Sequence, residues 1–248
     1  MTRDSIGRGR VVVFQSQRGY RFTVDSVLLA NFAIERLREM AIEQPNIAEL
    51  GVGSGVVAIW MAIGAQSASV TGIEIQPTLV RLARAGVKAN GLAARVKIVS
   101  GDLRAIPSSR FSVFPAASFD LVVTNPPYHR VAAGRVSPNT ERAIARHEVH
   151  ATIDDTIAAA RHLLAPNGRL VIVYPSAGRS RLNAALDRHG LSASATREIR
   201  ARAELPPRFI LVEASAGGVE RALPPVTLFE SPGVYTRTAD SILTQGPA

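Results

Sequence analysis

The stretch 47–55, Ile-Ala-Glu-Leu-Gly-Val-Gly-Ser-Gly, places the strongest constraint on what this chain can fold into. A short apolar run ends there in three alternate glycines and leads into a further apolar stretch. That order predicts a strand, a glycine loop and a helix. We expect Gly51 to permit the tight turn, Gly53 to let a ligand approach the backbone, and Gly55 to allow close helix packing. The G-x-G-x-G spacing differs from the dinucleotide G-x-G-x-x-G, and no P-loop G-K-[ST] is present.

Acidic side chains stand at the ends of the next predicted strands. Residues 69–73 are apolar and β-branched, and Glu74 follows them 19 residues after Gly55. A carboxylate at that position can accept hydrogen bonds from ribose hydroxyls. Asp102 ends a third predicted strand, where it can accept from an adenine amino group, and Glu49 lies in the first strand. Three strand-end acids in this order indicate one ligand site along the edge of a parallel sheet.

A fourth predicted strand, 119–124, runs into Asn125-Pro126-Pro127-Tyr128. Two successive prolines cannot continue a strand, so the chain must leave the sheet at its carboxyl end, where ligands bind. The Asn125 side-chain oxygen and the Pro126 carbonyl can accept both N–H groups of an amine and localise its lone pair on nitrogen. The Tyr128 ring can stack on a flat substrate. The loop therefore suits transfer to an exocyclic or amide nitrogen.

Other segments alternate between strand and helix patterns, which favours an α/β fold. The start predicts a hairpin of strands 11–15 and 20–24 with a turn at 17–19. A helix capped by Asp25 or Ser26 should follow and run through Leu37. After the proline loop, 129–139 reads as a substrate loop and 142–150 as a helical stretch with basic residues. The pattern then predicts helices over 152–165 and 177–189, strands over 169–174, 191–199 and 208–214, and a loosely ordered tail over 215–248.

Composition narrows the class of protein and of partner. A chain of 248 residues that is 46% hydrophobic fits one large α/β domain or one domain with appendages. Its 29 basic and 20 acidic residues give a net charge of +9, almost all from arginine, which favours a polyanionic partner such as RNA. No apolar run approaches the length of a membrane span and no signal segment is evident, so we expect a cytoplasmic protein with no membrane association. Without cysteine, disulfides, thiolate metal sites and a cysteine nucleophile are excluded.

These motifs together resemble the Class I S-adenosylmethionine-dependent methyltransferases. The first motif is the run 49–55, Glu-Leu-Gly-Val-Gly-Ser-Gly; Glu74 is the second and Asp102 the third, while Asn-Pro-Pro-Tyr is typical of the amino-methylating branch. The stretch 18–29, Arg-Gly-Tyr-Arg-Phe-Thr-Val-Asp-Ser-Val-Leu-Leu, is similar to the bacterial tRNA(Val) adenine-N6-methyltransferase family. Ala-Arg-His-Glu at 145–148 and Gly-Val-Tyr-Thr at 233–236 are similar to it as well.

The resemblance implies a doubly wound, seven-stranded and mostly parallel α/β sheet, with the last strand antiparallel. It implies a methyltransferase domain over 46–214, preceded by a hairpin and helix in 1–45 and followed by an extension over 215–248. S-adenosylmethionine would be the cofactor, tRNA the partner, and no metal would be required. The implied site residues are Glu49 at the methionine amino group, the loop glycines Gly51, Gly53 and Gly55, Glu74 at the ribose, Asp102 at the adenine, and Asn125, Pro126, Pro127 and Tyr128 at the substrate base, with Asn125 also beside the cofactor.

Several alternatives remain open from the sequence. The sequence alone does not distinguish well between a guanine-N2 RNA methyltransferase and an adenine-N6 methyltransferase. A protein glutamine N5-methyltransferase needs the same two acceptors, but such enzymes carry a helical domain before the first motif. Here 46 residues precede the strand 47–50 that leads into the motif, and they predict a hairpin and one helix. A non-enzymatic RNA-binding module would not need every cofactor acid, and a DNA adenine methyltransferase would need more chain to read duplex sequence. The target nucleotide stays open, as does the choice between monomer and homodimer.

Overall fold

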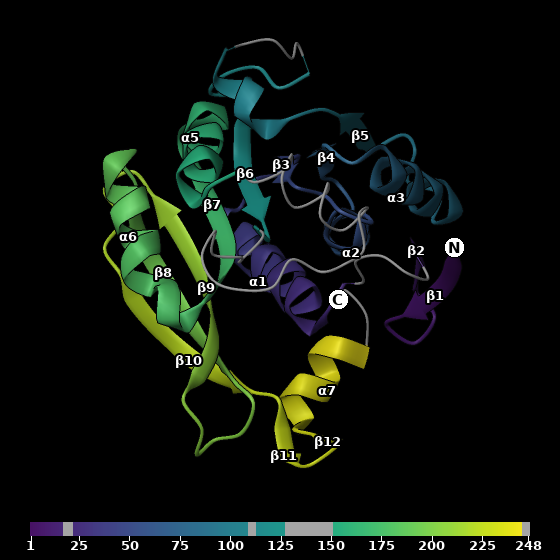
Figure 1. Ribbon diagram of the computed structural model, residues 1–248, viewed down its shortest axis with the longest axis vertical. Helices are drawn as coiled ribbons and strands as arrows, with labels where there is room; N and C mark the ends of the chain where they lie inside the picture. The colour runs from purple at the N-terminus through teal and green to yellow at the C-terminus, as the bar shows by residue number, and fades with distance from the viewer. Residues whose placement is uncertain (17–21, 109–112, 127–150, 245–248) are drawn as a thin grey trace, which may run out of the picture.

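Figure 1 shows the computed structural model, which describes residues 1–16, 22–108, 113–126 and 151–244. Helices and strands alternate along most of this length, as the sequence predicts. In chain order the elements are β1 (Thr2–Ile6), β2 (Val11–Gln15), α1 (Val24–Met40), β3 (Asn46–Leu50), α2 (Val56–Gly64), β4 (Ser69–Glu74), α3 (Pro77–Ala89), β5 (Val96–Ser100), η1 (Leu103–Ser108), β6 (Phe119–Thr124), α5 (Ile153–Leu163), β7 (Leu164–Pro175), η2 (Ser176–Gly178), α6 (Arg179–Arg188), β8 (Ser192–Arg200), β9 (Pro207–Ser215), β10 (Arg221–Thr227), β11 (Phe229–Ser231), β12 (Val234–Tyr235) and α7 (Arg237–Thr244).

The central sheet has the strand order β10-β8-β9-β7-β6-β3-β4-β5. Strands β7, β6, β3, β4 and β5 are parallel to one another, and β9 is antiparallel to both β7 and β8. The prediction of a doubly wound, mostly parallel α/β sheet with an antiparallel strand is therefore confirmed. The sheet is one strand larger than expected, because β10 adds to it parallel to β8.

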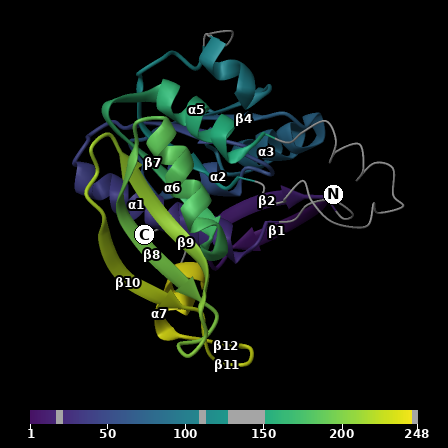
Figure 2. The same ribbon diagram turned by 60° about the vertical axis from the view of Figure 1, so that its left-hand side comes forward.

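Helices cover both faces of this sheet (Figure 1 and Figure 2). Alternate residues of the strands point to opposite faces, so Leu121 and Val123 pack with α1 and α2, whereas Val122 packs with α5 and α6. Trp60 on α2 is fully buried in the first of these two apolar clusters. Two buried layers hold the strands in register, which fixes the positions of their carboxyl ends.

The N-terminal hairpin differs from the prediction. Strand β2 pairs antiparallel with β1. Of the predicted partner strand 20–24, residues 20 and 21 lie outside the described part of the chain, and residues 22–24 do not form a strand. The turn lies at residues 7–10, where Gly7, Arg8 and Gly9 all have positive φ angles of 58°, 53° and 90°. A turn with successive left-handed residues matches the twist of a two-stranded ribbon, so this glycine-punctuated segment closes the hairpin. Val24 instead begins α1, and the expected turn at 17–19 lies outside the described residues.

The expectation of a loosely ordered tail after residue 215 was wrong up to residue 244. Strand β10 joins the sheet, and α7 packs on α1, where the Asn31 side chain donates to the Ile242 carbonyl at 3.4 Å. Strand β10 contains Pro224 and Pro225, and its register shifts between Leu223 and Val226. An edge strand tolerates prolines that a central strand would not. The two prolines made this segment look unlike a strand in the sequence, so it was not predicted.

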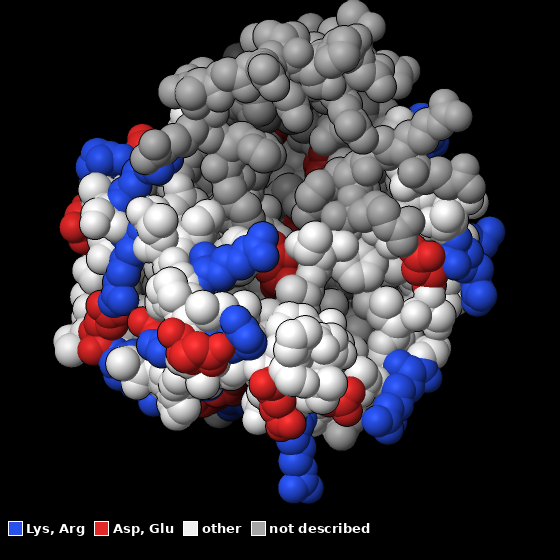
Figure 3. Space-filling model, turned by 60° about the horizontal axis from the view of Figure 1, so that its bottom comes forward, with Lys and Arg blue, Asp and Glu red and all other residues white. Residues whose placement is uncertain are grey.

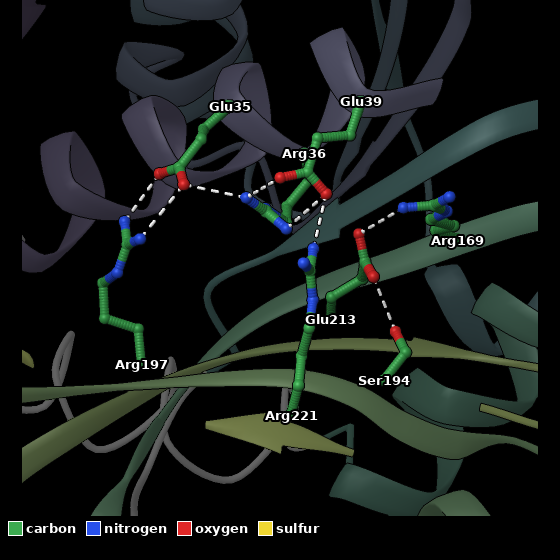
Figure 4. A network of polar contacts seen from close by, with 8 residues as sticks. All are labelled: Glu35, Arg36, Glu39, Arg169, Ser194, Arg197, Glu213 and Arg221. Carbon is green, nitrogen blue, oxygen red and sulfur yellow. Dashed lines mark hydrogen bonds and ion pairs between the residues drawn. The ribbon is translucent and has the colours of Figure 1, made fainter. Parts of the chain in front are cut away.

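Side chains from α1 tie the added strand to the sheet (Figure 4). Glu39 on α1 pairs with Arg221 on β10 at 2.5 Å, and Glu35 accepts two hydrogen bonds from Arg197 on β8 at 2.6 and 3.0 Å. Arg36 lies between the two carboxylates and is 1% exposed. None of the helices described here is both long and apolar enough to cross a bilayer.

Candidate active site

The carboxyl ends of four parallel strands meet at one edge of the sheet. In the register, Leu50 of β3 is paired with Ile73 of β4 and with Thr124 of β6, and Glu74 is paired with Ser100 of β5. The chain runs outward from β3 through β4 to β5 and then returns to the other side of β3 as β6, so the strand order reverses between β3 and β6. Open α/β sheets bind ligands in the crevice outside such a reversal.

The glycine loop after β3 takes the conformation that its sequence predicts. Gly51, Gly53 and Gly55 have φ angles of 72°, 58° and 86°, which side chains with a Cβ rarely adopt. A Cβ on Gly55 would lie 3.0 Å from the Cβ of Ala83 on α3, so this glycine allows the start of α2 to pack closely on α3. A Cβ on Gly53 would meet nothing within 4 Å, so the backbone there faces open space, as a ligand-approach position requires.

Glu74 at the end of β4 is held by the loop itself. Its Oε2 accepts the Gly53 backbone N–H at 2.9 Å and its Oε1 accepts the Gln76 backbone N–H at 2.9 Å. Burial raises the pKa of Glu74, and these backbone donors oppose the shift. A carboxylate has about four acceptor positions, so two backbone donors leave capacity for a pair of ligand hydroxyls. This geometry fits the predicted contact with a ribose.

Glu49 in β3 is 3% exposed, and its Oε2 has no hydrogen-bond partner within the described part of the chain. The Oγ of Ser54, in the glycine loop, is likewise buried without one there. Burial raises the pKa of Glu49 well above its usual value; a hydrogen bond from the Ala58 backbone opposes the shift and the charge of Glu74 adds to it. Buried polar atoms without partners are rare in native proteins. An unpaired carboxylate oxygen beside an open glycine loop fits the cationic amino group of S-adenosylmethionine.

Asp102 follows β5 and lies beside the other strand ends, but its carboxylate is already engaged. Arg104 donates to it through Nε at 2.8 Å and through its terminal nitrogen at 2.5 Å, and the Arg104 backbone N–H adds a bond of 2.9 Å. The hydrogen bond from the Arg104 side chain lowers the pKa of Asp102. A contact from Asp102 to an adenine amino group remains a prediction, and it requires the carboxylate to accept one more donor or Arg104 to move.

Asn125 follows β6 directly and lies at the strand reversal. The preceding Thr124 hydroxyl donates to the Leu50 carbonyl at 3.0 Å and so joins the ends of β6 and β3. Asn125 Nδ2 donates to the Ser26 Oγ at 3.2 Å and faces an Asp25 carboxylate oxygen at 3.5 Å. Pro126 is buried. Pro127 and Tyr128, like the predicted loop 129–139 and helical stretch 142–150, lie outside the described residues, so their roles stay predictions.

Asp25 and Ser26 belong to the site, although the sequence suggested them only as helix caps. The N-cap is Thr23, and the two residues lie in the first turn of α1 with exposed fractions of 5% and 3%. Asp25 Oδ1 accepts the Ser26 backbone N–H at 3.0 Å and a hydrogen bond from the Thr23 hydroxyl. A carboxylate only accepts hydrogen bonds, so Asn125 must turn its NH₂ group toward Asp25. The acceptor oxygen of Asn125 is thereby directed away from α1.

Comparison with known proteins identifies the family of this chain. A family model described as the methyltransferase small domain matches residues 25–189. A protein of Porphyromonas gingivalis named tRNA1(Val) (adenine(37)-N6)-methyltransferase is 32% identical over 86% of this chain and 81% of its own length. A protein of the same name from Glaesserella parasuis is 27% identical over 77% of each chain.

Solved structures show the same fold. A predicted O-methyltransferase from Agrobacterium tumefaciens superposes with a TM-score of 0.66 at 22% identity, and the match covers 90% of this chain and 97% of the other. A putative RNA methyltransferase from Pyrococcus horikoshii gives a TM-score of 0.55 at 16% identity over 80% and 88% of the two chains. At these identities the similarity establishes the fold. It does not show which atom is methylated, so that question depends on the residues of the site.

Proposed function

Because this chain belongs to the methyltransferase small domain family and is an S-adenosylmethionine-dependent methyltransferase, we propose that it methylates the exocyclic N6 amine of an adenine in tRNA. The observation that carries the proposal is Asn125, whose amide is oriented by Asp25 and Ser26 at the strand reversal. Relatives that carry the tRNA adenine-N6 name support the same acceptor.

The chemistry of an exocyclic amine explains why these groups are needed. Its lone pair is delocalised into the purine ring and attacks poorly until the nitrogen is held as a pyramidal donor. Asn125 Oδ1 and the Pro126 carbonyl would each accept one N–H group, and both acceptors would strengthen their bonds as positive charge develops on the nitrogen. When bound, S-adenosylmethionine supplies an electrophilic methyl group on a sulfonium centre.

The other side chains at the carboxyl ends of the strands would hold the cofactor and the adenine in place. Glu49 would bind the amino group of the cofactor and Glu74 its ribose hydroxyls, while Gly53 leaves room for it along the loop. An adenine in a stacked loop must leave its stack to reach Asn125, which requires a few kcal/mol that binding in the pocket offsets. Alignment of amine and methyl group is then the main contribution of the protein. A tRNA substrate would place the enzyme in the cytoplasm.

The proposal is tested by finding the modified residue. The purified protein is incubated with labelled S-adenosylmethionine and, in separate reactions, with total tRNA, rRNA and protein from a strain that lacks the gene, and the products are digested and identified. We expect label in the tRNA fraction as N6-methyladenosine. Label found as N2-methylguanosine or in glutamine would contradict the proposed adenine substrate but would leave the proposed cofactor site in place. The Asn125→Ala variant serves as the control with strongly reduced transfer.

A further inference from the structure

We propose that the RNA backbone lies across one basic face of the protein, formed by the β1–β2 hairpin, α3 and the edge strand β5. We define the basic face by six exposed side chains: Arg3, Arg10, Arg81, Arg84, Lys88 and Lys97. The inference rests on the proposed function, since it says where a tRNA would bind to deliver its nucleotide. The inference assigns RNA binding to a surface that includes none of the active-site residues.

The net charge of the chain is concentrated in the two segments that build this face. Residues 1–16 and 75–101 together hold eight basic residues and one acidic residue, a net charge of +7. The other 205 residues hold 21 basic and 19 acidic residues, a net charge of +2. Thus 43 residues carry most of the positive charge of the protein, and they come from separate parts of the sequence.

The basic residues of this face have no carboxylate partner in the described chain. Arg81 donates to the Thr78 hydroxyl at 3.2 Å and Arg84 to the Ile98 carbonyl at 2.8 Å, and both groups are uncharged. The single acid, Asp4, accepts a hydrogen bond from the Gln15 side chain. None of the six side chains is therefore paired with an acid of the described chain, whereas Arg8 of the hairpin, which is not one of the six, lies 4.0 Å from Asp240.

The opposite side of the molecule uses its arginines differently. Between β7 and β10, seven of nine arginines form ion pairs with a carboxylate: Arg169, Arg179, Arg188, Arg197, Arg200, Arg202 and Arg221. A high arginine content alone therefore does not explain the basic face, because the same residue type is paired elsewhere. Figure 3 shows blue side chains along the right-hand side of the molecule, on which Figure 1 places α3 and the hairpin.

Contacts between the three elements make the face one continuous surface. Asn90, just after α3, bonds both backbone groups of Val12 in β2, accepting its N–H at 3.0 Å and donating to its carbonyl at 2.7 Å. The Arg84 side chain joins α3 to the Ile98 backbone of β5. On α3 the exposed Arg81 and Lys88 lie two turns apart on the helix side away from the core.

The basic face also adjoins both halves of the active site. Helix α3 begins at Pro77, three residues after the cofactor acid Glu74. On the other side, Gln15 at the end of β2 accepts the Phe22 backbone N–H at 3.0 Å, three residues before Asp25. Phosphates bound along α3 and the hairpin would thus place a neighbouring flipped nucleotide next to Asn125. Arginine forks match phosphate oxygens, and phosphate contacts position a nucleic acid without reading its sequence.

The test compares two variants that lose the same charge. The face variant carries Arg3→Gln, Arg81→Gln and Lys88→Gln. The matched control carries Arg161→Gln, Arg181→Gln and Arg208→Gln, which are exposed on α5, α6 and β9 and form no ion pair within the described chain. The dissociation constant for a tRNA transcript is measured by filter binding over a salt series, and S-adenosylmethionine affinity by calorimetry.

We expect the face variant to bind tRNA at least about 10-fold more weakly than the wild type and to lose about 2 to 3 from the slope of log K against log salt. The control should stay within about 3-fold, and cofactor affinity should be unchanged in both, which shows that both fold. Equal tRNA binding by the face variant and the control would overturn the proposal that the basic face binds RNA. Wild-type protein that binds cofactor but no tRNA would overturn the proposed function and the face together. The single variants Arg81→Gln and Arg161→Gln give the same comparison if a triple variant is unstable.

Discussion

Carboxylates lie in two regions of this protein with opposite surroundings: Glu49 at the strand ends is 3% exposed, whereas Glu35 on α1 is 42% exposed. At the strand ends, burial raises the pKa values of Glu49 and Glu74, and Glu49 has no basic partner in the described chain. Between α1 and β8, burial also raises the pKa of Glu35, but hydrogen bonding and the charge of Arg197 outweigh it, so the pKa is lowered. The paired carboxylate stabilises the fold without a ligand. We expect the unpaired one to gain its partner when a cation binds, which would separate structural from functional acids.

The largest effect of a substitution at the strand ends is expected at Asn125. Asn125→Ala removes one of the two acceptors for the amine, and we expect kcat to fall about 10²- to 10³-fold while the cofactor dissociation constant changes by only a few-fold. Single-turnover rates and calorimetry measure the two quantities. Turnover equal to the wild type would remove Asn125 from the mechanism, and loss of cofactor affinity alone would make it a cofactor ligand instead.

The unpaired state of Glu49 predicts a pH effect. A carboxyl whose pKa is raised on folding contributes stability that is present at low pH and is lost as pH rises from the unfolded value, 4.5, through the folded value. A bound cation lowers that pKa, so cofactor binding should release a proton in the same pH window. Calorimetry in buffers of different ionisation enthalpy measures the release.

Glu49→Gln is the matched variant for this measurement, because the amide has the same shape and does not ionise. We expect the proton release to disappear and cofactor affinity to fall about 10-fold or more, as for a lost charge-assisted hydrogen bond. Proton release that persists in the variant would assign it to another group, and Glu74 would be the next to replace.

Asp25 tests how far the rate depends on a residue that contacts the Asn125 side chain. Asp25→Leu removes one of the acceptors that orient the Asn125 amide and leaves Ser26 in place, and we expect kcat to fall about 10-fold or more with little change in cofactor affinity, as for lost orientation. Asp25→Asn retains an oxygen that can accept from Asn125 and should recover part of the rate. A variant that lowers thermal stability and cofactor affinity together with kcat would show a structural role only.

The parts of the site that could be predicted depend on local sequence, and the parts that could not depend on distant contacts. The strand-end positions of Glu49, Glu74 and Asn125 follow from apolar periodicity and breakers, which act over a few residues. Asp25 lies 100 residues from Asn125 in the chain, so nothing in its own surroundings separates its role from that of a helix cap.

The fold follows the same rule. The parallel strands were predictable because buried strands read as continuous apolar runs. Strand β10 reads Arg-Ala-Leu-Pro-Pro-Val-Thr and was not, since its two prolines argue against a strand and are tolerated only because β10 lies at the sheet edge, paired with β8. The pairing of β2 with β1 was missed for a different reason: β1 reads Thr-Arg-Asp-Ser-Ile, which is mostly polar, and its turn depends on left-handed backbone at residues 7–9.

The smallest expected effect lies in the paired region. Arg221 and Glu39 are 54% and 41% exposed, and exposed ion pairs contribute about 0 to 1 kcal/mol. Arg221→Gln should therefore lower the free energy of unfolding by less than about 1 kcal/mol, because Glu39 keeps its bond to Arg36. Arg197→Gln should lower it more, since Arg197 is 17% exposed and lies over the Phe32 ring. Both variants should keep the wild-type cofactor affinity, which denaturant titration and calorimetry check together. A loss of cofactor affinity in either would mean that the pairing on α1 reaches the site through Asp25 at the start of the same helix, and the two regions would then be coupled.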